Sequence, residues 1–253
     1  MFHLFLLLLC EMYTFVQNLM IMRKFFFFAL ILGMGLVFES KAQSRLVPVC
    51  RYDGFSSGEL KEYRMKFDEL LLSDRDELYF AFTVRPSWGA PSSCRFDAST
   101  SEFVLQDANE NIWFYYFGSH PEYKEEGSPE VEVMEHRCKV SRDAAKCFMD
   151  LFFAAVFSSS YTAASTGLDG VTYELFFDRG CYAAEFWSPD EGTNCYELKE
   201  VLDKLSAAVR ANDTAAIEAL LPDVKKLTKV FRKLLPKDIK EPEFQILWYD
   251  MNV

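Results

Sequence analysis

The sequence predicts an α+β fold: a mainly antiparallel β-sheet with a buried helix and a C-terminal helical segment. Three observations carry this prediction. Short apolar or alternating runs, each bounded by turn residues, recur through residues 43–195. One strongly apolar helical stripe interrupts them, and amphipathic helical periodicity dominates residues 196–253. Strands grouped before helices are typical of α+β proteins.

Composition and charge narrow the possible function classes. Of the 253 residues, 50% are apolar and 16% aromatic, which is enough to bury a large core and excludes a disordered or low-complexity chain. The net charge is −11. Because affinity for nucleic acid depends on basic surfaces that neutralise phosphates, this acidic balance predicts no nucleic-acid partner.

The N-terminal region has the pattern of a secretory signal peptide. Arg23 and Lys24 precede an apolar run over Phe25–Phe38, and Ser40 and Ala42 supply small residues at positions −3 and −1 of a cleavage site. The run is shorter than the roughly 20 apolar residues of a membrane span. The sequence therefore predicts cleavage after Ala42 and an exported soluble protein, periplasmic or secreted, with no stable membrane span after cleavage.

A second apolar run, Phe2–Leu9, lies before this signal. We interpret residues 1–42 as an N-terminal extension plus signal peptide, with the true start at Met1, Met20 or Met22. A misassigned start codon is the favoured explanation, and a membrane hairpin is the alternative. Residues 43–195 are then expected to form the sheet domain with one buried helix, and residues 196–253 a helical segment packed on the sheet.

Removal of residues 1–42 leaves an even number of cysteines in an oxidising compartment, which favours disulfides. Pairing neighbours in chain order gives the expected bonds Cys50–Cys94, Cys138–Cys147 and Cys181–Cys195. Two alternatives stay open: some cysteines are small buried apolar residues, or they bind zinc. The sequence has no C-x-x-C pair and no histidine at finger-like spacing, so we expect no metal and no cofactor.

The first predicted elements are strands. Tyr63–Phe67 alternates like a strand, although the same region also fits a helical stripe. Leu78–Val84 predicts the next strand, and Arg85–Ser101 a loop. Phe103–Gln106 and Ile112–Phe117 flank a turn rich in Asp and Asn, which predicts a hairpin whose second strand is apolar on both faces and central in the core.

Later elements have clearer boundaries. Val131–Val140 predicts a strand, and Ser141 caps a buried helix over Arg142–Phe157. Val171–Phe177 and Cys181–Trp187 predict a hairpin. At the C-terminal end we expect the following elements: a helix over Cys195–Arg210, a short helix capped by Asp213, another beginning near Pro222, and a strand at Phe244–Tyr249.

This hairpin gives the sharpest chemical hypothesis. With Arg179 and Gly180 at the turn, Glu174 lies opposite Glu185 and Thr172 opposite Trp187, all on one face. Two carboxylates about 5 Å apart suit acid/base chemistry on a glycosidic bond, and a neighbouring indole can stack on a sugar ring. The simpler interpretation is that both carboxylates are solvated or pair with a basic residue such as Arg179 or Arg95.

Other catalytic patterns are missing from the sequence. It has no G-x-S-x-G, no H-E-x-x-H and no glycine-rich phosphate loop. After signal cleavage only His120 and His136 remain as imidazole bases, and a pair formed by His136 and Cys138 is a weak candidate because a thiol nucleophile needs an accessible thiolate.

One local pattern is more distinctive. Asp169-Gly170 followed by Tyr173, then Trp187-Ser188-Pro189 before a leucine-rich helix, resembles a pattern of uncharacterised exported bacterial proteins. The resemblance covers about residues 167–205. It implies export and no particular activity.

Together these observations predict a non-catalytic, ligand- or partner-binding protein of the cell envelope, whose partner is an envelope protein or a glycan. Trp187 and Thr172 are the candidate ligand-binding residues. One alternative is a glycan hydrolase that uses Glu174 and Glu185. Another is a structural subunit of an envelope assembly, with the C-terminal amphipathic helices as its contact surface.

Overall fold

The centre of the fold is an antiparallel sheet of seven strands in the order β1-β7-β6-β2-β3-β4-β5. The computed structural model describes residues 45–49, 58–72, 79–118, 130–161, 169–178, 181–237 and 239. The strands are β1 Val47–Pro48, β2 Phe80–Pro86, β3 Ser92–Asp97, β4 Glu102–Ala108, β5 Val133–Lys139, β6 Val171–Phe177 and β7 Tyr182–Trp187. All described residues belong to one unit, 41–253.

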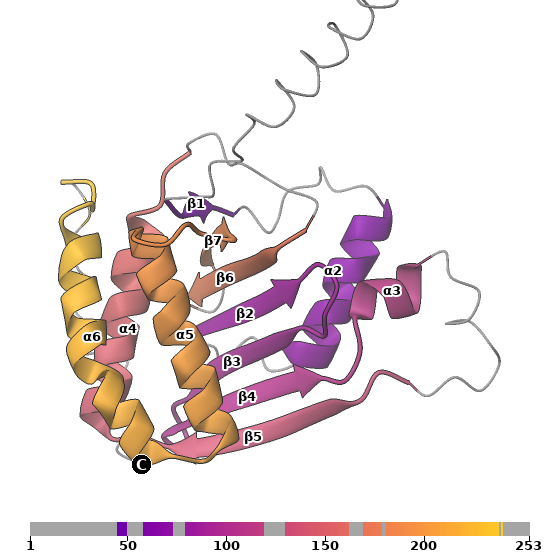
Figure 1. Ribbon diagram of the computed structural model, residues 1–253, viewed down its shortest axis with the longest axis horizontal. Helices are drawn as coiled ribbons and strands as arrows, with labels where there is room; N and C mark the ends of the chain where they lie inside the picture. The colour runs from indigo at the N-terminus through magenta and orange to yellow at the C-terminus, as the bar shows by residue number, and fades with distance from the viewer. Residues whose placement is uncertain are drawn as a thin grey trace, which may run out of the picture. The chain divides into compact units, whose positions relative to one another are not determined.

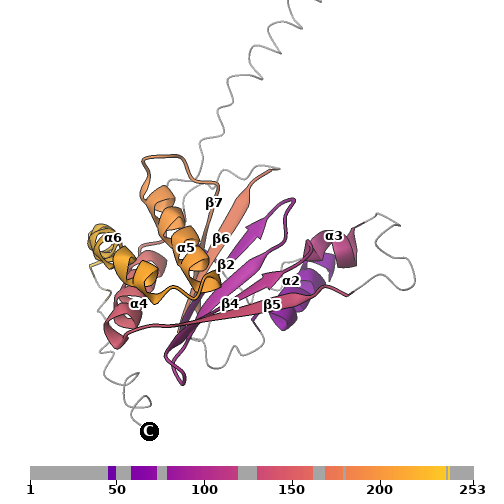
Figure 2. The ribbon, with the colours of Figure 1, turned by 60° about the horizontal axis from the view of Figure 1, so that its bottom comes forward.

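Helices cover both faces of this sheet. On one face lie α4 Arg142–Phe157, α5 Asn194–Arg210 and α6 Thr214–Arg232, and on the other lie α2 Gly58–Leu71 and α3 Ile112–Phe117 (Figure 1). The second view shows the same division into layers (Figure 2). The α+β class is therefore confirmed, with a C-terminal helical segment against the sheet.

The larger core lies between the sheet and α4, α5 and α6. Phe80 and Phe82 of β2 and Leu175 of β6 reach it from the sheet. Helix α4 begins where the sequence predicts, because the hydroxyl of Ser141 accepts a hydrogen bond from the Ala144 N–H at 3.1 Å. Its apolar residues are buried almost all around the helix, as expected for a helix at the centre of a core.

A smaller core lies under α2, where the expectation of a strand at Tyr63–Phe67 is wrong. These residues form the middle of helix α2, which buries Phe67 and Leu71 against Ala81 and Phe176 of the sheet. The apolar residues at helical spacing are the ones that pack against the sheet, so the local alternation at Tyr63–Phe67 was misleading.

The expectation of a central strand at Ile112–Phe117 is also wrong. The segment is the short helix α3, because the Asn111 side chain caps it by accepting a hydrogen bond from the Phe114 N–H at 3.1 Å. Only Ile112 of this helix is buried, and its aromatic residues are half-buried. Phe103–Gln106 therefore pairs with β5 and not with this segment.

The predicted loop Arg85–Ser101 contains strand β3. It pairs with β2 and β4, so it lies inside the sheet. Cys94 and Phe96 face the larger core, whereas Ser93 and Arg95 are buried on the other face. The sequence of this strand resembles a loop because it contains Ser93 and Arg95 and follows Trp88-Gly89 and Pro91.

The C-terminal helices differ from expectation at one point. Helix α6 is a single helix with Pro222 inside it, and not two helices. Its buried residues Leu220, Val224 and Leu227 form one continuous stripe across the proline. Residues 1–42 and the expected strand Phe244–Tyr249 lie outside the described residues.

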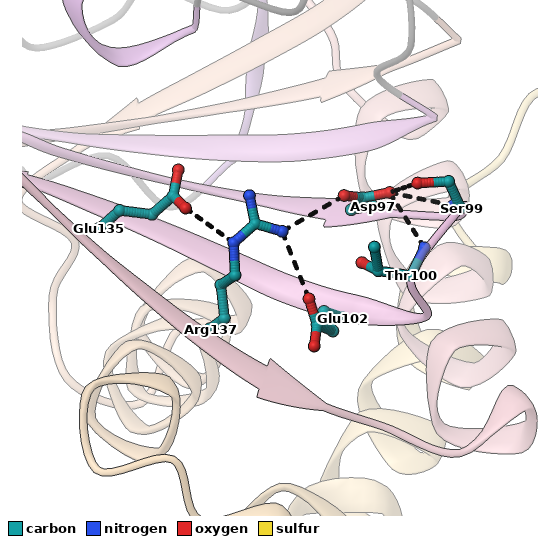
Figure 3. Close-up of polar contacts among 6 residues, drawn as sticks. All are labelled: Asp97, Ser99, Thr100, Glu102, Glu135 and Arg137. Carbon is teal, nitrogen blue, oxygen red and sulfur yellow. Dashed lines mark hydrogen bonds and ion pairs between the residues drawn. The ribbon is translucent and has the colours of Figure 1, made fainter.

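The face of β3, β4 and β5 opposite the larger core carries an ion-pair cluster (Figure 3). The Arg137 guanidinium lies 2.7 Å from a Glu135 oxygen, 3.3 Å from a Glu102 oxygen and 3.5 Å from an Asp97 oxygen. Asp97 also accepts hydrogen bonds from Ser99 and from the Thr100 N–H. The cluster ties the β3–β4 turn to β5, and its residues are hydrogen-bonded to one another.

Candidate functional site

The β6–β7 hairpin has the predicted register. Glu174 pairs with Glu185 and Thr172 with Trp187. The Cys181 N–H donates to the Asp178 carbonyl at 2.9 Å, which links the two strands at the turn. Because side chains alternate along a strand, all four predicted site residues lie on the sheet face of α2 and α3.

A third residue joins the two carboxylates. Arg85 of β2 places Nη2 3.1 Å from a Glu174 oxygen and 3.2 Å from a Glu185 oxygen. The Glu174 side chain is 3% exposed and that of Glu185 is 36% exposed. Burial works against the charge of Arg85, but the two carboxylates outweigh it and raise the Arg85 pKa. The basic partner is therefore Arg85, a residue that the sequence analysis did not single out.

This arrangement has a chemical consequence for the pair. A nearby guanidinium stabilises the charged form of a carboxylate, whereas a general acid must keep its proton near neutral pH. Burial of Glu174 and partial exposure of Glu185 give the two groups different surroundings, which acid/base pairs also have. Catalysis by Glu174 and Glu185 remains a prediction.

Thr172 and Trp187 have different surroundings. Thr172 pairs with Arg85 across β2 and β6 and lines a surface pocket. The Trp187 indole lies directly against Gly170, where a Cβ atom would collide with the ring. Trp187 is not among the residues that line this pocket.

The pocket has a volume of about 460 Å³ and lies between the end of β2, the start of β6, α2 and α3. Its lining consists of Tyr63, Arg85, Pro86, Ser87, Trp88, Asn111, Trp113, Phe114 and Thr172. Aromatic rings therefore form much of its wall, and a guanidinium, an amide and three hydroxyl-bearing side chains supply polar groups. Its volume lies within the range of small-ligand sites.

Trp88 is the most exposed ring of the pocket, with 72% of its surface open to solvent. Two contacts hold it in place. The ring stacks on Phe114 with centroids 5.2 Å apart and an interplanar angle of 15°, and its Nε1–H donates a hydrogen bond to Asp169. Because both contacts restrain the indole, its exposed face keeps one orientation beside the pocket.

Asn111 fixes the loop that carries Trp88. Its amide nitrogen donates to the Ser87 and Gly89 carbonyls at 3.3 and 2.9 Å, while its oxygen caps α3. One side chain thus ties the loop after β2 to the helix that carries Phe114. Both walls of the pocket are positioned by the same residue.

Tyr63 forms the α2 side of the pocket. Its ring meets Trp113 edge-on at 5.3 Å. Burial raises the Tyr63 pKa, Arg85 lowers it in part, and Glu174 raises it again. The phenol is therefore neutral at physiological pH and is able to donate and to accept a hydrogen bond.

The residues of the D-G-x-x-Y … W-S-P pattern have identifiable structural roles. Asp169 accepts from Trp88, and Gly170 leaves room for Trp187. Tyr173 donates to Asp203 of α5 at 2.9 Å, and burial together with Asp203 raises its pKa. Ser188 Oγ accepts from the Val171 N–H at 2.9 Å. The pattern thus builds the end of the hairpin next to the pocket.

The expectation of disulfides is not met among the described cysteines. Cys94, Cys138 and Cys195 are buried free thiols, Cys147 is a half-buried one, and Cys181 is an exposed one. Cys50 lies outside the described residues. Burial raises the pKa of Cys195 to about 12 and raises that of Cys94 further. These thiols behave as small apolar core residues, which was one of the alternatives.

The expected Cys138–Cys147 and Cys181–Cys195 bonds do not form, because all four thiols are free. Cys181 directly precedes β7, whereas Cys195 lies in the first turn of α5, after β7 and a connecting loop. Cys138 Sγ lies 3.6 Å from the Thr214 hydroxyl of α6. Burial raises the Cys147 pKa, and Lys225 lowers it in part.

The remaining candidates form no reactive cluster. His136 Nε2 lies 3.7 Å from Asp107, which Arg210 holds through two hydrogen bonds of 2.7 Å. His120 lies outside the described residues. Within the described ranges, no group of three or more His, Cys, Asp or Glu side chains is arranged to hold a metal ion, and no helix is long and apolar enough to cross a membrane.

Sequence reasoning missed Arg85, Trp88 and Asn111. The signal for Arg85 is the alternation of Thr83 and Arg85 with Phe82 and Val84, which gives β2 one polar face. Trp88 carries a weaker signal, an aromatic residue in a Pro-Ser-Trp-Gly turn. Neither residue is marked by the spacing of a known motif.

No protein-family model matches the sequence, and neither a curated protein nor a solved structure matches it.

Proposed function

We propose that this chain is an exported, non-catalytic binding protein of the cell envelope, periplasmic or secreted, whose ligand occupies the pocket beside Trp88. The observation that carries the proposal is a solvent-exposed indole held flat by Phe114 and Asp169 at the mouth of an aromatic pocket. Pockets that combine aromatic walls with a few polar groups are the usual sites of small-ligand binding.

Pre-organisation supports the same proposal. Binding is tighter when side chains already have the bound geometry, since less conformational entropy is lost. Asn111 restrains the Trp88 loop and α3 together, and the Arg85 guanidinium is restrained by two ion pairs. The groups that would contact a ligand are therefore held before it arrives.

Native mass spectrometry of the protein purified from its own cell envelope tests the proposal. We expect a mature chain that carries a non-covalent adduct of small-molecule mass. Trp88→Ala should remove the adduct, because the exposed stacking surface is lost. Tyr161→Ala is the matched control, since Tyr161 is an aromatic residue 84% exposed and does not line the pocket.

Two outcomes contradict the proposal. An adduct that survives Trp88→Ala would place the ligand elsewhere. Protein that is free of any adduct, and whose melting temperature does not rise with the small-molecule fraction of the same envelope, would mean that the pocket binds nothing there.

A glycan hydrolase is the second candidate, favoured by the paired positions and unequal burial of Glu174 and Glu185. This candidate predicts release of reducing ends from envelope glycans, with loss of activity in Glu174→Gln and Glu185→Gln. The binding proposal predicts no release by the wild-type chain. Reducing-end release measured on the wild type and both variants separates the two.

The structural-subunit interpretation required the C-terminal apolar stripes as a contact surface. The stripes of α5 and α6, which include Leu202, Leu205 and Phe231, are buried in the larger core of the chain itself. These apolar faces are already covered, so we do not build the proposal on them.

A further inference from the structure

The exposed face of Trp88 is flat and apolar, and its orientation is fixed. Stacking on Phe114 covers one side of the indole, and the hydrogen bond to Asp169 uses its only donor. What the indole offers to a ligand is therefore a π-face without a hydrogen-bonding group. The matching ligand surface is a flat array of C–H groups or another ring.

Polar groups lie in the same pocket. Arg85, Tyr63 and Thr172 contribute a guanidinium, a neutral phenol and a hydroxyl. Arg85 Nε is buried and has no hydrogen-bond partner among the described residues. The Tyr63 phenol and the Thr172 hydroxyl can each donate and accept a hydrogen bond, so the ligand also needs hydrogen-bonding groups.

The charges of the site argue against an ionic ligand. A cation in the pocket would meet the Arg85 guanidinium, which also lines it. An anion would compete with Glu174 and Glu185, which both already contact Arg85 Nη2. The three ionic groups carry a net charge of −1, which disfavours an anion, and the guanidinium on the pocket wall disfavours a cation, so the best match is a neutral ligand rich in hydroxyl or amide groups.

We infer that the pocket binds a neutral saccharide, with the C–H face of one sugar ring on Trp88 and its hydroxyl groups toward Arg85, Tyr63 and Thr172. A sugar ring combines the two surfaces that the pocket requires, an apolar face and a rim of hydrogen-bonding groups. The volume of about 460 Å³ is within the range of small-ligand sites. This inference rests on the proposed binding function and names its ligand class.

Isothermal titration calorimetry of the full mature chain tests the inference. The probes are the trisaccharides cellotriose, maltotriose, mannotriose and triacetylchitotriose. We expect at least one to bind with one site per chain. Trp88→Ala should weaken its binding about tenfold or more and Trp88→Phe less, because phenylalanine keeps a smaller stacking surface.

The variant Thr172→Val keeps the shape of the side chain and removes its hydroxyl, so we expect binding several-fold weaker with unchanged folding. Tyr161→Ala should bind like the wild type, since this residue lies outside the pocket. Circular dichroism melting of each variant separates lost binding from lost folding.

Three further probes separate this inference from the proposed function: indole, choline and benzoate, which are apolar, cationic and anionic. If none of the saccharides binds but one of these does, and Trp88→Ala abolishes it, the ligand class is wrong and the binding function stands. Saccharide binding unaffected by Trp88→Ala overturns the inference. If no probe of either set binds, the saccharide inference is overturned, and the native adduct alone decides the binding function.

Discussion

Arg85 connects the hairpin carboxylates to the pocket, so its removal has a predictable cost. Arg85→Met leaves the buried Glu174 without this counter-charge, and we expect a loss of about 3 kcal/mol in the free energy of unfolding at pH 7. Urea unfolding at pH 7 measures this loss, with Arg85→Lys as the charge-preserving control.

If Arg85→Met and Arg85→Lys were equally stable at pH 7, the ion pairs would contribute nothing. The same result would leave the Arg85 side chain as a packing element against Phe67, whose ring centre lies 5.9 Å from the guanidinium carbon.

Asp97 gives a second test at this scale. Partial burial raises its pKa, but hydrogen bonds from Ser99 and Thr100 outweigh this, so the Asp97 pKa is lowered from 3.8. A carboxyl group with a lowered folded-state pKa contributes stability above its unfolded pKa, and this stability is lost as the pH falls through the folded value. We expect Asp97→Asn to cost about 1 kcal/mol at pH 7.

The difference between wild type and Asp97→Asn should vanish as the pH falls from 4 to 2. Thermal unfolding across this range measures it, and Asp223→Asn on the exposed face of α6 is the control. A difference that stays constant down to pH 2 would show that the charge of Asp97 does not matter.

Among the secondary-structure elements, α3 and the Trp88 loop are connected by the hydrogen bonds of Asn111. Asn111→Asp keeps the oxygen that caps α3 and loses the donors to Ser87 and Gly89, whereas Asn111→Ala loses both. We expect Asn111→Ala to cost about 2 kcal/mol in stability and Asn111→Asp about half as much. Urea unfolding gives the stabilities, and calorimetry gives the effect on ligand affinity.

Ligand affinity should fall in both Asn111 variants, because Trp88 is then less restrained. If ligand affinity stayed at the wild-type level while stability fell, the hydrogen bonds of Asn111 would not be what restrains the indole.

The elements also show what the sequence was able to predict. The alternation in β6 and β7 is uninterrupted, so the register and the meeting of Glu174 and Glu185 follow from it. The stripe of α4 and its Ser141 cap fix that helix equally well. Local patterns were enough wherever one side of an element is apolar and its ends carry turn or cap residues.

Prediction failed where tertiary contacts override the local pattern. Ile112–Phe117 is apolar on every side, so periodicity gives no choice between strand and helix, and the Asn111 cap decides it. Strand β3 carries buried Ser93 and Arg95, which make it resemble a loop. The pocket joins residues 63, 85–88, 111, 113, 114 and 172, and no local pattern predicts that these meet.

For the whole molecule, export and thiol chemistry give the next test. We expect intact mass spectrometry to find a chain that begins at Gln43. Native alkylation with iodoacetamide should label Cys181 first, because it is exposed, while Cys94, Cys138 and Cys195 react only after unfolding. The raised pKa of Cys195, about 12, keeps its thiol protonated at the pH of labelling.

A mature chain that shows no alkylation even when unfolded, until a reductant is added, would mean that the cysteines form disulfides after all. Retention of residues 1–42 would contradict cleavage after Ala42. Both outcomes are read from the same spectra.

If the pocket beside Trp88 is the binding site, the indole N–H signals of the ¹⁵N-labelled mature chain should respond to the ligand. On addition of the small-molecule fraction of the cell envelope, we predict shifts of the Trp88 and Trp113 signals, which Trp88→Phe and Trp113→Phe assign. The Tyr161→Ala variant should give the same shifts. Unchanged Trp88 and Trp113 signals, while the fraction shifts backbone signals elsewhere in the chain, would contradict the account.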